Sequence, residues 1–119
     1  VTLIGRDDLG AYRITGQARA TAEDLLTGVD ESSVVIVMDH QPQRAYEFSE
    51  TADIQLSGHT HNGQIFPANL IVKAIYDNPW GLSAYERLKL VVSCGYGTWG
   101  PPIRIGSHSE IVVIKVKPI

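Results

Sequence analysis

The sequence is short of cysteine, of long apolar runs and of net charge, and each shortage excludes a class of protein or leaves one question open. Its single cysteine, Cys94, has no partner for a disulfide within the chain, so cysteine content does not distinguish an oxidising from a reducing compartment. No apolar stretch approaches the roughly 20 residues that a membrane-spanning helix needs. Ten Lys and Arg against 13 Asp and Glu give a net charge of −3, the wrong sign for holding nucleic acid by phosphate neutralisation. We therefore expect no nucleic-acid scaffold as a partner.

What the sequence does contain is the composition of one globular domain. Hydrophobic residues make up 44% of the 119 residues and charged residues 19%, a balance that can bury a core. The chain begins with Val1 instead of Met, and residues 1–4 already have the pattern of a strand. We therefore expect that further sequence precedes Val1 and was removed by processing or by the choice of boundaries.

The order of apolar runs and turn residues predicts an α/β chain. Residues 34–38 form a continuous apolar run, which is typical of a strand covered on both faces. Thr21 followed by two carboxylates is the pattern of a helix N-cap and predicts a helix over residues 22–27. The other predicted elements are strands at 1–4, 53–57, 89–93, 103–105 and 110–116, an extended segment at 12–15, and helices at 43–50 and 68–76.

Three of the four histidines follow two of the predicted strands. His40 comes shortly after one of them, and His59 and His61 come after the next, between Gly58 and Gly63. Because α/β proteins place their sites at strand ends, we expect these three side chains to converge. Neutral imidazole is the commonest metal ligand in proteins. The pattern therefore predicts a metal site, with ordinary polar loop residues as the alternative.

The segments around these histidines resemble the calcineurin-like metallophosphoesterases, in particular a branch of small phosphohydrolases with a Gly-His-Thr-His-Gly-Gly-Gln-Ile signature. Residues 53–67 are similar to that signature, with Asn62 where the branch usually has Gly. Residues 37–42 are similar to its strand followed by His-x-Pro, residues 92–106 resemble its closing segment, and residues 5–8 also fit the branch. The resemblance covers nearly the whole chain.

The resemblance implies a binuclear metal centre that hydrolyses a phosphoester substrate. His40 and His59 match positions that bind one metal, and His61 matches a ligand of the other. The family's Asp-x-His, Gly-Asp and Gly-Asn-His elements, which supply the remaining ligands, do not occur in this sequence. Three neutral imidazoles provide neither a bridging anion nor the roughly four to six ligands that each of two divalent ions needs. We therefore expect two divalent ions, Mn, Fe or Zn, only in a longer protein.

The expected fold class is α/β, with residues 1–119 as the C-terminal half of the family's α/β/β/α sandwich of two sheets. The N-terminal half of the same domain is then the expected partner. Without it the apolar strands lose their cover, so we expect exposed apolar surface and self-association, with a homodimer as the outcome. The resemblance leaves the location open between the cytoplasm and membrane attachment through an N-terminal segment.

Two other functions are compatible with the same residues. One is a non-catalytic association domain that holds a structural metal or none. The other is a hydrolase that binds a single zinc through the three histidines and keeps a fourth position open. The sequence upstream of Val1 would distinguish them, because the missing ligand elements support an enzyme and a start codon at this point does not.

A few further residues invite a chemical role. Arg104, by a bidentate contact with phosphate, and Trp99 are candidates for binding substrate, with a structural ion pair or core packing as the alternative. Residues 95–100 match a dinucleotide fingerprint, but extended sequence follows them, so no helix N-terminus is available for a pyrophosphate. His108 is expected to be solvated in a turn. Asp39 is expected to point to the opposite face from the adjacent histidine.

Overall fold

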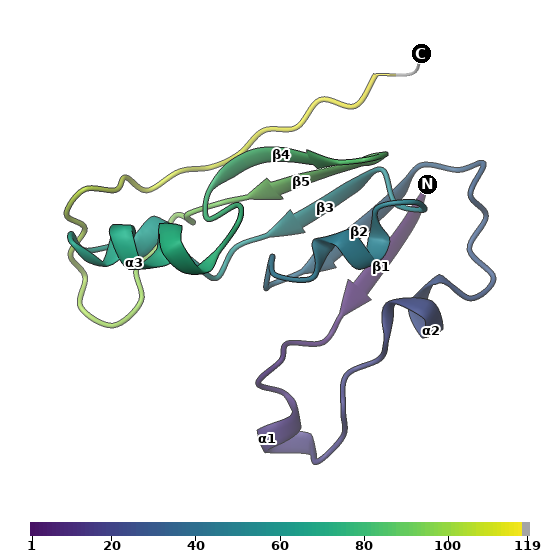
Figure 1. Ribbon diagram of the computed structural model, residues 1–119, viewed down its shortest axis with the longest axis horizontal. Helices are drawn as coiled ribbons and strands as arrows, with labels where there is room; N and C mark the ends of the chain where they lie inside the picture. The colour runs from purple at the N-terminus through teal and green to yellow at the C-terminus, as the bar shows by residue number, and fades with distance from the viewer. Residues whose placement is uncertain (118–119) are drawn as a thin grey trace.

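The protein, described for residues 1–117 by a computed structural model, is built around one five-stranded sheet (Figure 1). The strands are β1 (Thr2–Arg6), β2 (Val35–Asp39), β3 (Ile54–Ser57), β4 (Gly81–Tyr85) and β5 (Leu88–Val92). The helices are α1 (Tyr12–Thr15), α2 (Ala22–Leu26) and α3 (Ala68–Ile75), and the 3-10 turns are η1 (Ala45–Phe48) and η2 (His61–Gly63). None of the helices in this range has the length and apolar character to cross a membrane.

The strand order is β1-β2-β3-β5-β4, with β4 antiparallel to β5 and the other neighbours parallel. Parallel neighbours need crossover connections. Here α1 and α2 connect β1 to β2, η1 connects β2 to β3, and α3 with β4 lies between β3 and β5. Because parallel strands run in one direction, the loops that follow β2 and β3 leave the sheet side by side at the same end (Figure 1).

One face of the sheet carries the hydrophobic core. Alternate residues along a strand point to opposite faces, and the inward set of this sheet is almost fully buried. Phe48, at the end of η1, has no exposed surface and fills the space beneath the strands, which contributes about 1.5–3 kcal/mol of stability. The core consists of Ile4, Ala22, Val35, Val37, Ala45, Phe48, Ala52, Leu88, Leu90 and Val92.

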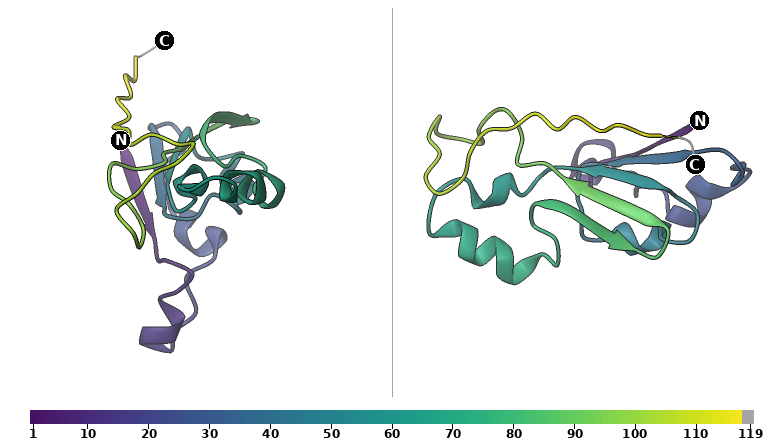
Figure 2. Two further views of the ribbon diagram at one scale, coloured as in Figure 1. Left: turned by 90° about the vertical axis from the view of Figure 1, so that its left-hand side faces the viewer. Right: turned by 90° about the horizontal axis from the view of Figure 1, so that it is seen from above.

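The opposite face of the sheet is largely uncovered within the described residues. Leu3, Met38 and Leu82 are 63%, 48% and 70% exposed. The C-terminal segment crosses this face (Figure 2) and leaves a cavity of about 580 Å³, whose lining includes Leu82, Val91, Val112 and Ile114. The α/β class is therefore confirmed, and Met38 shows the exposed apolar surface that is expected where residues 34–38 have cover on one face only. Self-association through the face stays a prediction.

Three predicted elements, one near the start of the chain and two near its end, are wrong. Residues 12–15 form helix α1 and are not extended, because Gly16 adopts a left-handed conformation and donates its N–H to the carbonyl of Tyr12. Residues 103–105 and 110–116 form no strand within the range 1–117, apart from one isolated bridge between Ile65 and Ile105. The last segment runs across a sheet face and not along an edge, so no ladder of backbone hydrogen bonds can form.

The middle of the chain follows the predicted order with two differences. The helix predicted over residues 43–50 is the short turn η1. Strand β4 was not predicted; it pairs with β5 through a tight turn in which Glu86 has a positive φ of 51°. The helix at residues 22–27 is confirmed as α2, with Thr21 accepting a hydrogen bond from the Asp24 N–H at 3.1 Å.

Candidate metal centre

His40 and His59 follow two neighbouring parallel strands, β2 and β3, and lie close to each other. The Gly58 N–H donates to the carbonyl of His40 at 3.0 Å, which continues the pairing of β2 with β3 beyond the strand ends. The two imidazole rings then lie 5.1 Å apart between centroids and almost perpendicular to each other. The structure thus brings these two predicted site residues together. That they bind metal stays a prediction.

The third histidine lies in a loop with an unusual backbone. Four non-glycine residues have positive φ angles between 41° and 68°, and these are His59, His61, Asn62 and Gln64. Each such residue costs about 1 kcal/mol or more, and the conformation persists only where surrounding contacts fix it. Thr60 provides one of these contacts, because its buried hydroxyl donates to the carbonyl of Pro79 at 2.6 Å. Asn62 adopts the left-handed conformation that asparagine tolerates well.

Gly63 is required where the histidine loop meets helix α3. Its φ is +74°, and a Cβ at this position would lie 2.2 Å from the Cα of Asn69. No side chain fits at that distance. Gly58, the other glycine that brackets the histidine pair, has no positive φ, and a Cβ there would make ordinary contacts with the His40 ring at 3.7 Å and the Ser93 carbonyl at 3.8 Å. Of these two glycines, therefore, only Gly63 cannot be replaced by a residue with a side chain without a steric clash.

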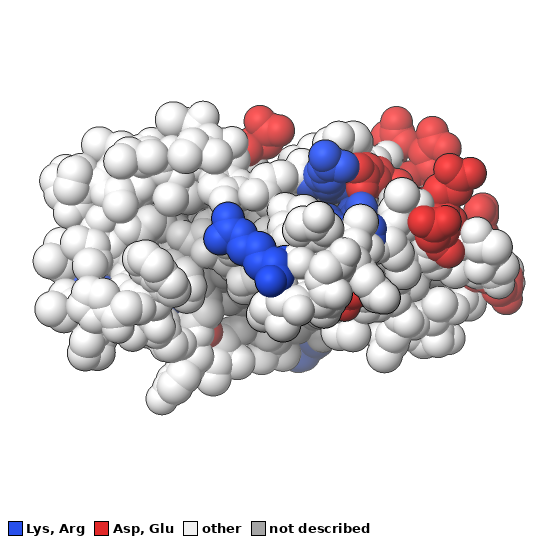
Figure 3. Space-filling view, turned by 90° about the horizontal axis from the view of Figure 1, so that it is seen from below, with Lys and Arg blue, Asp and Glu red and all other residues white. Residues whose placement is uncertain are grey.

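The three histidines line one pocket of about 510 Å³. Gln64 and Thr60 complete the polar wall, and an apolar wall is provided by Ala68, Val72 and Trp99. On the face drawn in Figure 3, charged side chains lie mainly at the end away from α3, and the α3 end is almost uncharged. The pocket thus offers nitrogen donors and an apolar side, without a carboxylate among its lining residues.

The surroundings of two pocket histidines, His59 and His61, favour the neutral form by lowering the pKa of each. Burial lowers the pKa of His59 below its ordinary value of 6.5, the nearby His40 lowers it further, and the Asp8 carboxylate acts in the opposite direction. Burial also lowers the pKa of His61, with Arg104 and the other two histidines acting in the same direction. A neutral imidazole keeps the lone pair that a metal ion needs.

These donors fit part of a metal shell and do not complete one. The Nδ1 of His61 is buried and has no hydrogen-bond partner among residues 1–117. Nitrogen donors of this kind suit Zn, Mn and Fe. In the described range, however, no three His, Cys, Asp or Glu side chains stand close enough to hold an ion by themselves. The histidines would need further ligands, carboxylates above all, to hold two divalent ions.

The two candidates for substrate binding have different surroundings. Trp99 is 76% exposed and lies on the apolar wall of the pocket, where a substrate can reach it. Arg104 does not line the pocket; its guanidinium donates to the carbonyls of His61, Cys94 and Gly97. These contacts are structural, like the ion pair that was the alternative to substrate binding, but the partners of Arg104 are backbone carbonyls and not a carboxylate.

His108 and Cys94 lie outside the pocket lining. The His108 side chain is exposed, and the carbonyl of the same residue accepts a hydrogen bond from the Cys94 thiol at 2.9 Å. Burial raises the pKa of that thiol above its ordinary value, so it stays protonated and is a poor nucleophile. Neither side chain adds a donor to the site.

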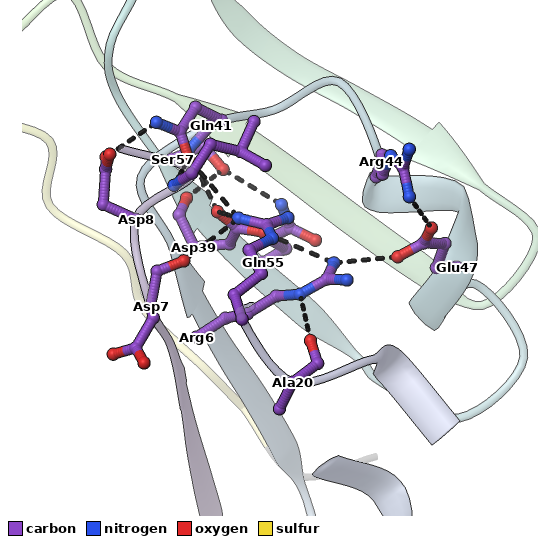
Figure 4. A network of polar contacts seen from close by, with 12 residues as sticks. Arg6, Asp7, Asp8, Ala20, Asp39, Gln41, Arg44, Glu47, Gln55 and Ser57 are labelled. Atoms are coloured by element: carbon purple, nitrogen blue, oxygen red, sulfur yellow. Dashed lines mark hydrogen bonds and ion pairs between the residues drawn. The ribbon is translucent and has the colours of Figure 1, made fainter. Parts of the chain in front are cut away.

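A buried ion-pair network surrounds Asp39, the residue before His40 (Figure 4). Asp39 is 1% exposed and accepts hydrogen bonds from Arg19 at 3.2 and 3.0 Å, and Arg6 lies 3.6 Å from the same carboxylate. Arg6 also pairs with Glu47 at 2.8 Å. Asp39 therefore points away from His40, as its place in the strand predicts, and joins β2 to β1 and to the segment before α2.

The sequence did not reveal how Gln41 links this network to the pocket. Its side-chain amide donates to Asp8 at 2.6 Å and its carbonyl oxygen accepts from the Leu9 N–H at 3.2 Å. These contacts hold the Asp8 carboxylate near His40 and His59. The backbone hydrogen bond from Gly10 is the main cause that lowers the pKa of Asp8, and the hydrogen bond from Gln41 lowers it further. The only signal in the sequence is that Gln41 follows His40 directly.

Comparison with known proteins finds relatives whose names contain the word metallophosphoesterase. An uncharacterized metallophosphoesterase of Campylobacter jejuni is 44% identical over 92 residues, which cover 75% of this chain and 24% of that protein. An uncharacterized metallophosphoesterase of Aquifex aeolicus is 31% identical over 119 residues, covering 98% of this chain and 46% of that protein. A Danio rerio protein named transmembrane protein with metallophosphoesterase domain is 36% identical over 124 residues, covering 98% and 28%.

The chain spans between about a quarter and about half of the length of these relatives. No family model matches the chain. No solved structure gives a significant match either.

Proposed function

The chain belongs to the calcineurin-like metallophosphoesterase family, and we propose that it forms part of a metal-dependent phosphoester hydrolase in which His40, His59 and His61 bind metal. The observation that carries this proposal is the meeting of the first two imidazoles, 5.1 Å apart, at the ends of adjacent parallel strands. Lone histidines in loops have no reason to meet in this way. Several of the matching relatives are themselves named uncharacterized, so the substrate is not given by the comparison.

The mechanism assigns each pocket residue a definite task. His59 and His61 stay neutral near pH 7 because burial lowers their pKa values, and so they offer lone pairs without first losing a proton. When bound, two divalent ions would stabilise charge on the phosphoryl group and acidify the attacking water. Trp99, Ala68 and Val72 form the side of the pocket against which an apolar or aromatic ester group would rest.

The remaining ligands would come from a partner segment. The pocket lining contains no carboxylate to bridge two ions, and the family's three other ligand elements do not occur in this sequence. We infer that the N-terminal half of the same domain supplies them and that the metals are Mn, Fe or Zn. The complete site would then form where that half meets the loops after β2 and β3.

Hydrolysis of chromogenic phosphoesters by the natural full-length protein tests the proposal. Turnover of a p-nitrophenyl monoester and of a diester should require added divalent metal. His40→Asn and His59→Asn should each lower kcat/KM by more than about 100-fold, because loss of a ligand should exceed the 10–100-fold effect typical of a supporting residue. His108→Asn is the matched control, since it removes an exposed histidine outside the pocket lining. Full turnover by the His59 variant would refute the proposal.

A non-catalytic association domain is the second candidate, and the uncovered sheet face favours it. Leu3, Met38 and Leu82 expose apolar surface on one face of the sheet. Exposed apolar faces of this kind mark interaction sites. In this case light scattering would detect self-association with or without added metal. Neither the wild type nor His59→Asn would hydrolyse a phosphoester, and the two would associate equally.

A further inference from the structure

Arg104 sits at the junction between the histidine loop and the glycine-rich loop after β5. Its Nη1 donates to the His61 carbonyl at 3.3 Å and to the Ser107 hydroxyl at 3.3 Å. Its Nη2 donates to the carbonyls of Cys94 at 2.8 Å and Gly95 at 3.2 Å, and also to that of Gly97. One planar guanidinium thus joins the backbone of the histidine loop to that of residues 94–97.

The residue that Arg104 contacts, His61, lies in the part of the site whose backbone is strained. His61 has a φ of 49°, and Asn62 and Gln64 beside it have φ angles of 49° and 41°. A β-carbon makes this conformation unfavourable, so it needs restraint from outside the loop. If the restraint is lost, the backbone relaxes and the His61 ring leaves its place on the pocket wall.

The other side-chain restraints on the loop act on the neighbours of His61, whose carbonyl also accepts the Gln64 N–H at 2.9 Å within the loop. The Gln64 side-chain carbonyl accepts from the Trp99 N–H at 2.7 Å, and its amide donates to the carbonyls of Trp99 at 2.8 Å and Pro101 at 3.2 Å. The Thr60 hydroxyl donates a hydrogen bond to the carbonyl of Pro79 at 2.6 Å. Among the side chains of residues 1–117, only Arg104 donates a hydrogen bond to the His61 backbone.

The contacts of Arg104 leave little of the guanidinium for a substrate. Both terminal nitrogens already donate to oxygens of the protein. The remaining nitrogen, Nε, is buried and has no partner in the described range, so solvent and a phosphate oxygen cannot reach it. A lysine could not reproduce these contacts, because an ammonium lacks the rigid planar fork that reaches several acceptors at once.

We propose that Arg104 is a positioning residue that fixes His61 for metal binding and does not contact the phosphate of the substrate. The proposal rests on the proposed function above, since it assigns a supporting residue to one of its ligands. Arg104 donates to the His61 carbonyl and also to carbonyls of the loop after β5. The His61 imidazole is therefore held at the pocket wall in the metal-free protein. Metal affinity therefore depends on a residue outside the pocket lining.

Titration calorimetry with Mn²⁺ in the absence of substrate tests the proposal on the natural full-length protein. Arg104→Lys and Arg104→Met should each weaken Mn²⁺ binding about 10–100-fold, the range found when a group that orients a metal ligand is removed. Arg13→Met is the matched control, because it removes an exposed arginine in the last turn of α1, and it should bind Mn²⁺ like the wild type. At saturating Mn²⁺, the Arg104 variants should have an unchanged KM for the phosphoester.

The outcomes separate this proposal from the proposed function. Wild-type Mn²⁺ affinity in both Arg104 variants, with a raised KM, would show that the arginine binds phosphate and would overturn the proposal. Unfolding of both variants, seen by circular dichroism, would also overturn it, since a role confined to the His61 loop leaves the core of the sheet intact. Failure of the wild type itself to bind Mn²⁺ or any of the other candidate metals would instead refute the metal site, and with it the role assigned to Arg104.

Discussion

Replacement of Asp39 by Asn should cost several kcal/mol of the free energy of unfolding. The Asp39 carboxylate is 1% exposed and lies between two arginines. Arg19 donates to both of its oxygens, at 3.2 and 3.0 Å, and Nη1 of Arg6 lies 3.6 Å away. Asparagine keeps the shape of the side chain but not its charge, so the guanidinium groups lose their anion inside the protein (Figure 4).

The magnitude follows from how the pairs are buried. Removal of one partner of a buried ion pair typically costs about 3–5 kcal/mol, because the other charge is left uncompensated. Glu47, 2.8 Å from Arg6, still compensates one of the two arginines. We therefore expect a loss near the lower end, about 3 kcal/mol. This is a large share of the roughly 5–15 kcal/mol that stabilises a typical protein.

Urea unfolding of the natural full-length protein, followed by circular dichroism, measures this loss. Arg44→Gln is the control, because it breaks an ion pair with Glu47 at 3.2 Å in which the Arg44 side chain is 59% exposed. Exposed pairs of this spacing contribute about 0.2–0.5 kcal/mol. If Asp39→Asn costs less than about 1 kcal/mol, or no more than the control, the network does not hold β1 and β2 together as argued.

Two further predictions concern the histidine loop. Gly63→Ala should destabilise the protein clearly more than Gly16→Ala in the same urea assay: both residues have positive φ, which costs alanine about 1 kcal/mol, but only at Gly63 would the Cβ collide with the Asn69 backbone. Equal losses would show that the close approach of α3 can relax. Mn²⁺ affinity should decline mainly where the pH falls below 6.5, the ordinary pKa of histidine. The reason is that the lowered pKa values of His59 and His61 delay the competition from protons, and a decline already above pH 7 in calorimetry would contradict this.

The buried strands of the fold could be predicted from the sequence because each is a short apolar run between turn residues. β2, β3 and β5 lie within one or two residues of their predicted bounds. Residues 110–116 have the same apolar pattern but are not a strand in the described range, because strand formation also needs a free edge with which to pair. A single sequence does not show which edge, if any, is within reach.

Only the part of the candidate site that depends on the order of strands and loops along the chain could be predicted. His40 and His59 meet because parallel strands end at the same end of a sheet, a rule that needs only the strand positions. The restraint on His61 depends on Arg104, 43 residues further along the chain, for which the sequence leaves a phosphate contact and a structural ion pair both open. Its use is decided by the backbone carbonyls around it, which only the folded chain brings together.

The most direct test of the account is the metal content of the natural full-length protein after gel filtration, measured by mass spectrometry of the elements. The account predicts that the wild type and His108→Asn retain divalent metal, and that His40→Asn, His59→Asn and His61→Asn each lose a large part of it. If all three of these variants keep the wild-type content, the three histidines do not bind the metal and the central claim is wrong.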